Sequence, residues 1–444
     1  MESHLAPGVV VLNKRYFSRD PLVTAQVGAT SFTFSVLTVL RQENILSGLV
    51  LYSRNERLAT IRCEVEEDWN GAVVVTMYFN FRMDKLQIAT GLKKAFRLAS
   101  SRQVKPSHPI IYYQTDTLLH YHPEGYRFFV THHGPFASHF AQEYSLDLAR
   151  LSFGGSQDKA ANLYRQQQLG IQRLLQDNQG TVLAHSRLQQ HILENTGLNK
   201  NRFKYLNPPI GVPPSSDPTL LPTAMQHFIH GADLLLLTAV ARLDYFKNVE
   251  LTIKSGLELL KTGGTPVRVL IVGDPDSDDS RRRALLEPVP AEQRAHFMVS
   301  PRLAKDQLYA LFRAVRRNGV FICTSRYETL GITPLEAAAA GVVTLITETP
   351  NVEALAFMPV GCRVPREASC IASRVRAICR EGITGWAEMV KRHVRPATSL
   401  EGFRGDLLAA WEGMSGAHTR ESPAETEARS DRSLQNGERR TCCC

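Results

Sequence analysis

The chain has 444 residues, 43% of them hydrophobic and 21% charged, which is an ordinary balance for a soluble globular protein. This length exceeds the usual size of one hydrophobic core, so we expect two domains. The first residues lack the pattern of a secretory signal peptide. The longest apolar run, Leu234 to Val240, is far shorter than the roughly 20 residues that cross a bilayer. Secreted and membrane-spanning proteins are therefore disfavoured, and we predict a cytoplasmic location.

The formal net charge is +9. Residues 415 to 444 hold five arginines and five acidic residues, so the excess charge lies on the folded body and favours anionic ligands or an anionic surface. Of the eight cysteines, five are scattered without the spacing of metal ligands, and Cys442 to Cys444 lack a prenylation pattern. We expect no metal site, no nucleic-acid partner and a reducing compartment.

In the first half of the chain, short β-branched or aromatic runs alternate with helix-like segments, which predicts repeated βα units. The expected strands are Val9 to Leu12, Val73 to Phe79, Ile110 to Tyr113, Phe128 to Thr131 and Val182 to His185. Residues 207 to 222 are too rich in proline for a helix or central strand, and we predict that they link the two domains.

The second half repeats this alternation, which predicts another parallel sheet. Its expected strands are Leu234 to Val240, Val267 to Val272, Phe297 to Val299, Val320 to Cys323 and Val342 to Ile346. We predict a first domain over residues 1 to 206, completed by a helix near 400 to 414, and a second over 223 to 399. Residues 415 to 444 lose apolar periodicity and are predicted to be disordered.

Two acidic residues eight positions apart, Glu328 and Glu336, follow the expected strand Val320 to Cys323. Thr333 and Pro334 are typical of a helix start, so the turn before them is predicted to direct backbone amides toward an anion. A carboxylate nearby can accept hydrogen bonds from sugar hydroxyls. The alternatives are a capping box between Thr333 and Glu336 and a solvated loop position for Glu328.

Two cations, Arg242 and Lys247, flank the turn that follows the expected strand Leu234 to Val240. Turns of this kind hold ligands in α/β proteins. Arginine offers a bidentate fork and lysine a point charge, and the pair suits a diphosphate. Ordinary surface charges on a solvated loop are the alternative.

The Arg242-x4-Lys247 and Glu328-x7-Glu336 motifs together resemble those of the family-4 retaining glycosyltransferases of GT-B fold. The resemblance implies two facing Rossmann-like domains with a cleft between them, and transfer from a nucleoside-diphosphate sugar, UDP- or GDP-linked, with retention at the anomeric carbon and without a metal or other cofactor. Arg242 and Lys247 would hold the diphosphate, Glu328 the sugar and Glu336 the ribose. Further donor contacts are implied for Thr329, Leu330, Gly331 and Ile332, with Arg302 and Leu303 near the base.

The resemblance also implies contributions from the first domain. Gly28 stands where the family has a glycine-rich loop, and His133 is similar in position to the active-site histidine, with His132 as the alternative. Asp116, at another strand end, would face the acceptor or cap a loop. The catalytic set implied is therefore Arg242, Lys247, Glu328 and His133.

The acceptor is predicted to be a hydroxyl of a small molecule or glycan. Lys85 to Arg102 forms a basic amphipathic pattern that suits either an anionic membrane or a helix packed on a sheet, and we favour the packed helix and a soluble acceptor. Two other functions remain open: a GT-B isomerase or phosphorylase, and a catalytically silent sugar-nucleotide-binding subunit.

Overall fold

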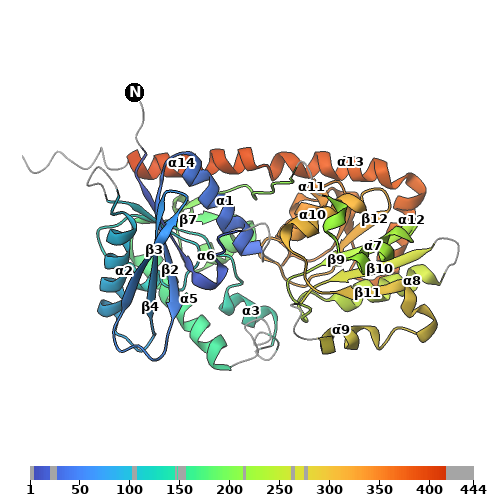
Figure 1. Cartoon of the computed structure of the whole chain (residues 1–444), viewed down its shortest axis with the longest axis horizontal. Helices are drawn as coiled ribbons and strands as arrows, with labels where there is room; N and C mark the ends of the chain where they lie inside the picture. The colour runs from blue at the N-terminus through green and yellow to red at the C-terminus, as the bar shows by residue number, and fades with distance from the viewer. Residues whose placement is uncertain are drawn as a thin grey trace, which may run out of the picture.

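The computed structural model describes residues 5–20, 28–102, 108–145, 148, 157–213, 217–261, 266–274 and 279–416. The predicted disordered tail, residues 415 to 444, lies outside these residues from residue 417 onward, Cys442 to Cys444 included. Its first two residues, Ser415 and Gly416, are instead helical and end α14 (Leu400–Gly416). The chain forms two α/β domains placed side by side (Figure 1). The predicted fold class, two Rossmann-like domains, is confirmed.

The first domain is built on an eight-stranded sheet with the order β3-β4-β2-β1-β5-β6-β7-β8. Every strand pairs in parallel except β3, which runs antiparallel to β4 at the edge. The strands are β1 (Gly8–Asn13), β2 (Leu46–Arg54), β3 (Arg62–Trp69), β4 (Ala72–Phe79), β5 (Ile110–Tyr113), β6 (Phe128–Val130), β7 (Gly180–Ala184) and β8 (Phe203–Tyr205). Its helices are α1 (Gly28–Gln42), α2 (Lys85–Ala99), α3 (Ala137–Glu143), α5 (Gln157–Gln176) and α6 (Arg187–Asn195).

The second domain contains a six-stranded parallel sheet with the order β11-β10-β9-β12-β13-β14. The strands are β9 (Leu234–Ala239), β10 (Val267–Val272), β11 (Phe297–Ser300), β12 (Gly319–Cys323), β13 (Val343–Thr347) and β14 (Arg363–Val364). All six residues of β9 are buried, as expected for a parallel strand covered by helices on both faces. The helices are α7 (Thr223–His230), α8 (Val249–Leu260), α9 (Asp279–Leu286), α10 (Lys305–Ala314), α11 (Ile332–Ala339), α12 (Ala368–Glu381) and α13 (Ile383–Val394).

The chain crosses between the domains twice. After α13 it continues into α14 (Leu400–Gly416), and the two helices run along one side of the molecule, one over each domain (Figure 1). Phe403, Leu407 and Trp411 of α14 are fully buried in the core of the first domain. The indole nitrogen of Trp411 donates a hydrogen bond to the carbonyl of Ala6 at 2.7 Å. The first domain is therefore assembled from both ends of the described chain.

One carboxylate joins the domains at a helix start. Glu353 lies in a short 3₁₀ segment of the second domain, Glu353–Phe357, and is 8% exposed. It accepts hydrogen bonds from the backbone amides of Arg187 (2.9 Å) and Leu188 (3.1 Å) in the first turn of α6. Ser186 caps the same helix by accepting from the amide of Gln189. A residue of one domain thus satisfies amides that the other domain would leave unpaired.

Helix α2 packs on the first sheet. Its residues Ile88, Leu92 and Phe96 are buried in the core, while Lys93 and Lys94 are exposed. Most of the apolar face that a membrane would need is therefore used inside the domain, although Leu86 is 75% exposed, and the packed helix is the arrangement that the structure has. None of the helices in the described ranges combines the length and the apolar character needed to span a lipid bilayer.

Candidate donor site between the domains

The strand order places a topological switch point at the centre of the second sheet. Chain connections leave β9 toward β10 on one side, whereas β12 lies on its other side, so the direction of strand progression changes between β9 and β12. Ligands of open α/β sheets bind at this point, beyond the carboxyl ends of the strands. The loops there, residues 240 to 248 and 324 to 331, contain Arg242, Lys247 and Glu328.

Lys247 and Glu328 meet directly. The Lys247 ammonium forms an ion pair with Glu328 Oε1, and their side chains are 15% and 21% exposed. Ser325 Oγ donates to the same carboxylate oxygen at 2.9 Å. Thr324 Oγ1 donates to the backbone carbonyl of Lys247 at 3.1 Å, which ties the two loops together. A lysine has three donors, so the ion pair leaves capacity for a second anion.

Arg242 lies nearer to solvent. Its Nε is 2.9 Å from Asp244 Oδ2, and its side chain is 51% exposed. Asp244 Oδ1 accepts hydrogen bonds from the amides of Phe246 (3.0 Å) and Lys247 (3.1 Å), forming an Asx turn that shapes the loop. Sequence reasoning did not single out Asp244, although an aspartate two residues before an aromatic-lysine pair in a loop is a recognisable turn signal.

The two loops have a small positive excess. Arg242, Lys247 and Arg326 stand against the carboxylates of Asp244 and Glu328, which leaves one more cation than anion. The Arg326 side chain is occupied by the loop itself, since it donates to the Tyr245 carbonyl at 3.2 Å and to Asn248 Oδ1 at 2.8 Å. Arg242 and Lys247 are therefore the cations best placed for an anionic ligand.

Glu336 is buried in α11 and does not form the capping box that was one alternative. Its carboxylate pairs with Lys305 and accepts a hydrogen bond from the Tyr309 hydroxyl at 3.3 Å. Burial, followed by the nearby Glu336 charge, raises the pKa of Tyr309 well above its usual value. Helix α11 begins at Ile332, two residues before Pro334, the predicted first helical residue, and Gly331 caps it without a side-chain hydrogen bond. Lys305 and Tyr309, both on α10, were not foreseen.

The turn before α11 depends on glycine. Gly331 has a φ of 87°, and a Cβ there would lie 2.9 Å from the Cβ of Ala354. Any larger residue would meet both backbone strain and a steric clash. The carbonyl of Leu330 accepts from the amide of Ala354 at 2.7 Å, which fixes the turn from the other side. The start of α11 thus directs its first amides out of the carboxyl edge of the sheet.

Arg302 and Leu303 follow β11. The amide of Arg302 donates to the carbonyl of Asp274 at 2.8 Å, and Asp274 Oδ1 accepts from the amide of Leu243 at 2.9 Å. Asp274 therefore links the loops after β9 and β11. The side chain of Leu303 is buried in the domain core, so only its backbone is available to a ligand.

Two contacts of the first domain lie beside the turn that precedes α11. Thr329 Oγ1 donates to the carbonyl of His133 at 2.9 Å. A Cβ built on Gly28, at the start of α1, would lie 3.2 Å from Ile332 Cδ1. Gln26 and Val27, which precede Gly28 in the predicted loop, lie outside the described residues, whereas Ala29, Thr30 and Ser31 lie in the first turn of α1. Gly28 and His133 thus adjoin the turn that contains Thr329 and Ile332.

Three histidines cluster at the same edge of the first sheet. His133 Nε2 is 3.2 Å from Gln114 Oε1, and its ring stacks on His185 with centroids 5.2 Å apart. Burial and then the neighbouring His185 and His132 hold the pKa of His133 well below its usual value, so the ring is neutral. Gln114 and His185, like Asp244 and Lys305, belong to the site region but were not predicted.

His132 and Asp116 form a buried pair. His132 Nδ1 is 3.3 Å from Asp116 Oδ2, and the two residues are 4% and 8% exposed. His132 therefore points into the domain, whereas His133 faces the second domain through its backbone. Of the two histidines, His133 lies nearer to the predicted donor residues.

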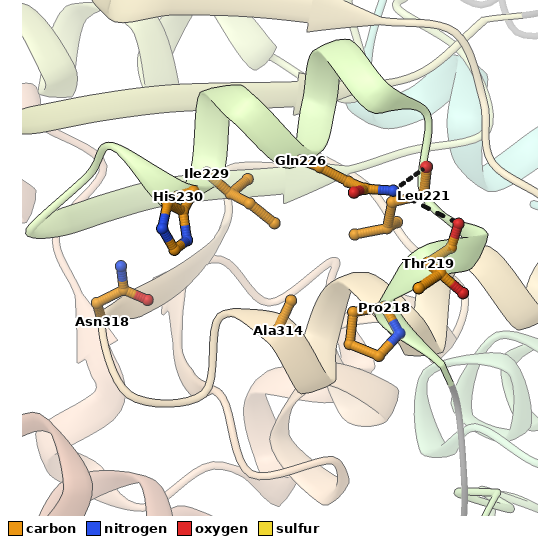
Figure 2. Close-up of a pocket in the computed structure, with 8 residues that line it drawn as sticks. All are labelled: Pro218, Thr219, Leu221, Gln226, Ile229, His230, Ala314 and Asn318. Carbon is orange, nitrogen blue, oxygen red and sulfur yellow. Dashed lines mark hydrogen bonds between the residues drawn. The ribbon is translucent and has the colours of Figure 1, made fainter.

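A pocket of about 310 Å³ lies elsewhere, at the amino ends of the second sheet (Figure 2). Gln226 on its wall donates hydrogen bonds to the carbonyls of Thr219 (3.4 Å) and Leu221 (2.7 Å). None of the predicted site residues lines this pocket. Within the described part of the chain, no group of three metal-binding side chains comes together.

Comparison with known proteins agrees with this geometry. Residues 225–356 match the family of group 1 glycosyl transferases. Similar solved structures include the α,α-trehalose 6-phosphate synthase of Burkholderia multivorans (13% identity, TM-score 0.62, covering 94% of this chain and 98% of that one). Another is the sucrose-phosphate synthase of Thermosynechococcus elongatus (14%, 0.60, 93% and 100%). A third is the trehalose-phosphate synthase of Burkholderia xenovorans in complex with glucose-6-phosphate (11%, 0.59, 92% and 100%). No curated protein sequence matches the chain.

The fold is therefore that of the GT-B glycosyltransferases. The segment that matches the group 1 family contains Arg242, Lys247, Glu328 and Glu336 and spans most of the second sheet. The chain carries a group 1 glycosyltransferase domain and is a transferase enzyme.

Proposed function

We propose that the chain is a retaining family-4 glycosyltransferase that moves a hexosyl or N-acetylhexosaminyl group from a UDP- or GDP-linked sugar to a hydroxyl acceptor. The observation that carries the proposal is the convergence of Lys247 and Glu328 at the switch point between β9 and β12, with His133 of the first domain hydrogen-bonded through its carbonyl to the adjacent Thr329. At this edge of the sheet a cation suits the phosphate, a carboxylate suits the sugar, and a neutral imidazole suits the acceptor.

The proposed roles of the site residues follow from the charge that develops during the transfer. When the bond between the anomeric carbon and the diphosphate breaks, negative charge develops on the leaving diphosphate. Lys247 and Arg242 stabilise that charge, which is the main electrostatic demand of the step. Glu328 accepts hydrogen bonds from sugar hydroxyls, and Glu336, held by Lys305, does the same for the ribose. The two cations neutralise the leaving group without a metal ion.

The acceptor is proposed to be a small soluble hydroxyl compound. Helix α2 packs most of its apolar face inside the domain, which supports a soluble acceptor over a membrane-bound one. The Burkholderia xenovorans trehalose-phosphate synthase was solved with glucose-6-phosphate, and a sugar phosphate is therefore a sensible first acceptor to test.

The experiment measures free nucleoside diphosphate from a set of UDP- and GDP-sugars, with and without sugar and sugar-phosphate acceptors. We expect release to depend on an acceptor, the product to keep the donor's anomeric configuration by NMR, and added EDTA to leave the rate unchanged. Release of nucleotide without an acceptor would favour the isomerase or phosphorylase alternative. Donor binding without any turnover would favour the silent binding subunit.

A further inference from the structure

A small aromatic cluster joins the domains beside the candidate donor site. Phe140 of α3 packs against Phe246 and Tyr327 of the second domain, with ring centroids 4.4 Å and 4.9 Å apart. These three side chains are 1%, 2% and 5% exposed, and the partly buried Tyr144 and Tyr245 pack against them. Phe140 is thus an apolar side chain of one domain inserted between two loops of the other.

Both rings that Phe140 touches belong to residues next to the predicted donor side chains. Phe246 immediately precedes Lys247, and Tyr327 immediately precedes Glu328. Neighbouring Cα atoms are separated by a fixed distance of about 3.8 Å, so a backbone shift at Phe246 or Tyr327 also displaces the adjacent charged residue. The packing of one phenylalanine therefore bears on both partners of the Lys247–Glu328 ion pair.

Helix α3 also makes polar contacts with the same loops. The Tyr144 hydroxyl donates to the carbonyl of Arg326 at 3.0 Å, and His139 Nδ1 is 3.3 Å from the Tyr327 hydroxyl. Asn351 donates from its side-chain amide to Glu143 at 3.1 Å, and its carbonyl accepts from the amide of Glu328 at 2.8 Å. These contacts fix the orientation of α3 relative to the loop that carries Glu328.

The two loops are joined to each other beneath the ring cluster. The amide of Arg326 donates to the carbonyl of Phe246 at 2.7 Å. With the Arg326 side chain bound to the Tyr245 carbonyl and to Asn248, the two loops are linked at three points.

We infer that Phe140 is a positioning residue that aligns Lys247 and Glu328 for the reaction by wedging between Phe246 and Tyr327 when the domains meet. The inference rests on the proposed function. Contact between the domains then does more than enclose the substrate, because it sets the separation of the cation and the carboxylate that act on the donor.

The test uses Phe140→Ala and Phe140→Leu, with Phe96→Leu as the matched control. Phe96 is a fully buried aromatic residue of the same domain, on α2, and belongs to a different core cluster. We expect Phe140→Ala to lower kcat by about tenfold or more with a smaller change in donor KM, since misplacement by about 1 Å can cost that much. Phe140→Leu should recover part of the rate, and Phe96→Leu should keep it.

A second readout does not depend on turnover. Hydrogen exchange at the amides of Lys247, bonded to Asp244 at 3.1 Å, and of Glu328, bonded to Asn351 at 2.8 Å, reports opening of the two loops. Exchange should accelerate at both in the Phe140 variants and remain at the wild-type rate in Phe96→Leu. Should Phe140→Ala fail to fold, Phe140→Leu supplies the comparison.

The inference is overturned if the Phe140 and Phe96 variants behave alike in exchange at these two amides, or if folded Phe140→Ala retains wild-type kcat. Failure of the proposed function gives a different result. In that case wild-type protein neither binds UDP or GDP in calorimetry nor releases them from their sugars, while the exchange comparison still decides whether Phe140 positions the loops.

Discussion

Lys247 is the side chain on which the proposed chemistry most depends. Lys247→Ala should lower turnover by about 100-fold, because the cation that stabilises the departing diphosphate is lost. Folding should change by no more than about 1 kcal/mol, because Glu328 remains partly exposed and keeps its hydrogen bond from Ser325.

Steady-state rates and urea unfolding measure the two effects separately. The control is Lys254→Ala, which removes an exposed lysine from α8. A Lys247→Ala enzyme with near-normal turnover would refute the assigned role.

Two buried histidines make stability depend on pH. Burial lowers the pKa of both His122 and His185 to about 4, below the value of about 6.5 in an unfolded chain. Between these values the unfolded state binds more protons, so the free energy of unfolding falls as the pH drops from about 6.5 to 4, by up to about 1.4 kcal/mol per pH unit for each histidine.

Urea unfolding at pH 7, 5.5 and 4.5 tests this dependence. His185→Gln should flatten the decline, while His393→Gln, at an exposed position of α13, should follow the wild type. An unchanged slope in His185→Gln would show that its titration does not contribute.

The start of α6 depends on a residue from the other domain. Glu353→Ala leaves the amides of Arg187 and Leu188 without their acceptor, and removal of such a cap costs about 1 to 2 kcal/mol. Glu353→Gln keeps an accepting oxygen and should lose less.

Hydrogen exchange at Arg187 and Leu188 and the unfolding midpoint measure the effect, with the exposed Glu348→Ala as control. Equal exchange at these two amides in wild type and Glu353→Ala would contradict an interdomain cap.

The elements that could be predicted from sequence are those with continuous apolar runs. Strands β1, β4, β5, β6 and β7 and all strands of the second domain except β14 lie within one or two residues of their expected bounds. Strand β2 was missed because Gly48 interrupts its apolar run; the structure needs that glycine, since a Cβ would lie 2.2 Å from the carbonyl oxygen of Ala99. Strand β3 alternates with charges at an edge, and β8 and β14 are too short to give a pattern.

The charged residues of the candidate site were predicted from the sequence, but the residues that they contact were not. Local spacing indicated Lys247 and Glu328, which the fold brings into contact. The same local reasoning offered a capping role for Glu336, but Lys305 and Tyr309 on α10 bind that carboxylate instead. Such partners are about 30 residues distant in sequence, and only the packing of α10 beside α11 brings them near. Gln114 and Phe140 could not be predicted as site residues for the same reason.

Across the whole molecule, α14 holds the first domain together. Trp411→Ala removes a fully buried indole that packs against Gly8, and should lower the free energy of unfolding by about 3 to 5 kcal/mol. Trp386→Ala, at a half-buried position of the second domain, should cost less.

The midpoint of denaturant unfolding measures the loss of stability in both variants. If Trp411→Ala and Trp386→Ala shift the midpoint equally, α14 does not have the structural role that its burial indicates.

The position of α14 has a consequence for biosynthesis. Domains generally fold in the order in which the ribosome releases them. Here the core around Phe32 and Val10 is closed by Phe403, Leu407 and Trp411, which are synthesised after the entire second domain. The first domain therefore keeps apolar surface exposed until α14 is synthesised, whereas the second domain can already fold before that. Nascent chains of this protein should consequently engage chaperones through their N-terminal half, and translational stalling beyond residue 399 should be a vulnerable moment for aggregation.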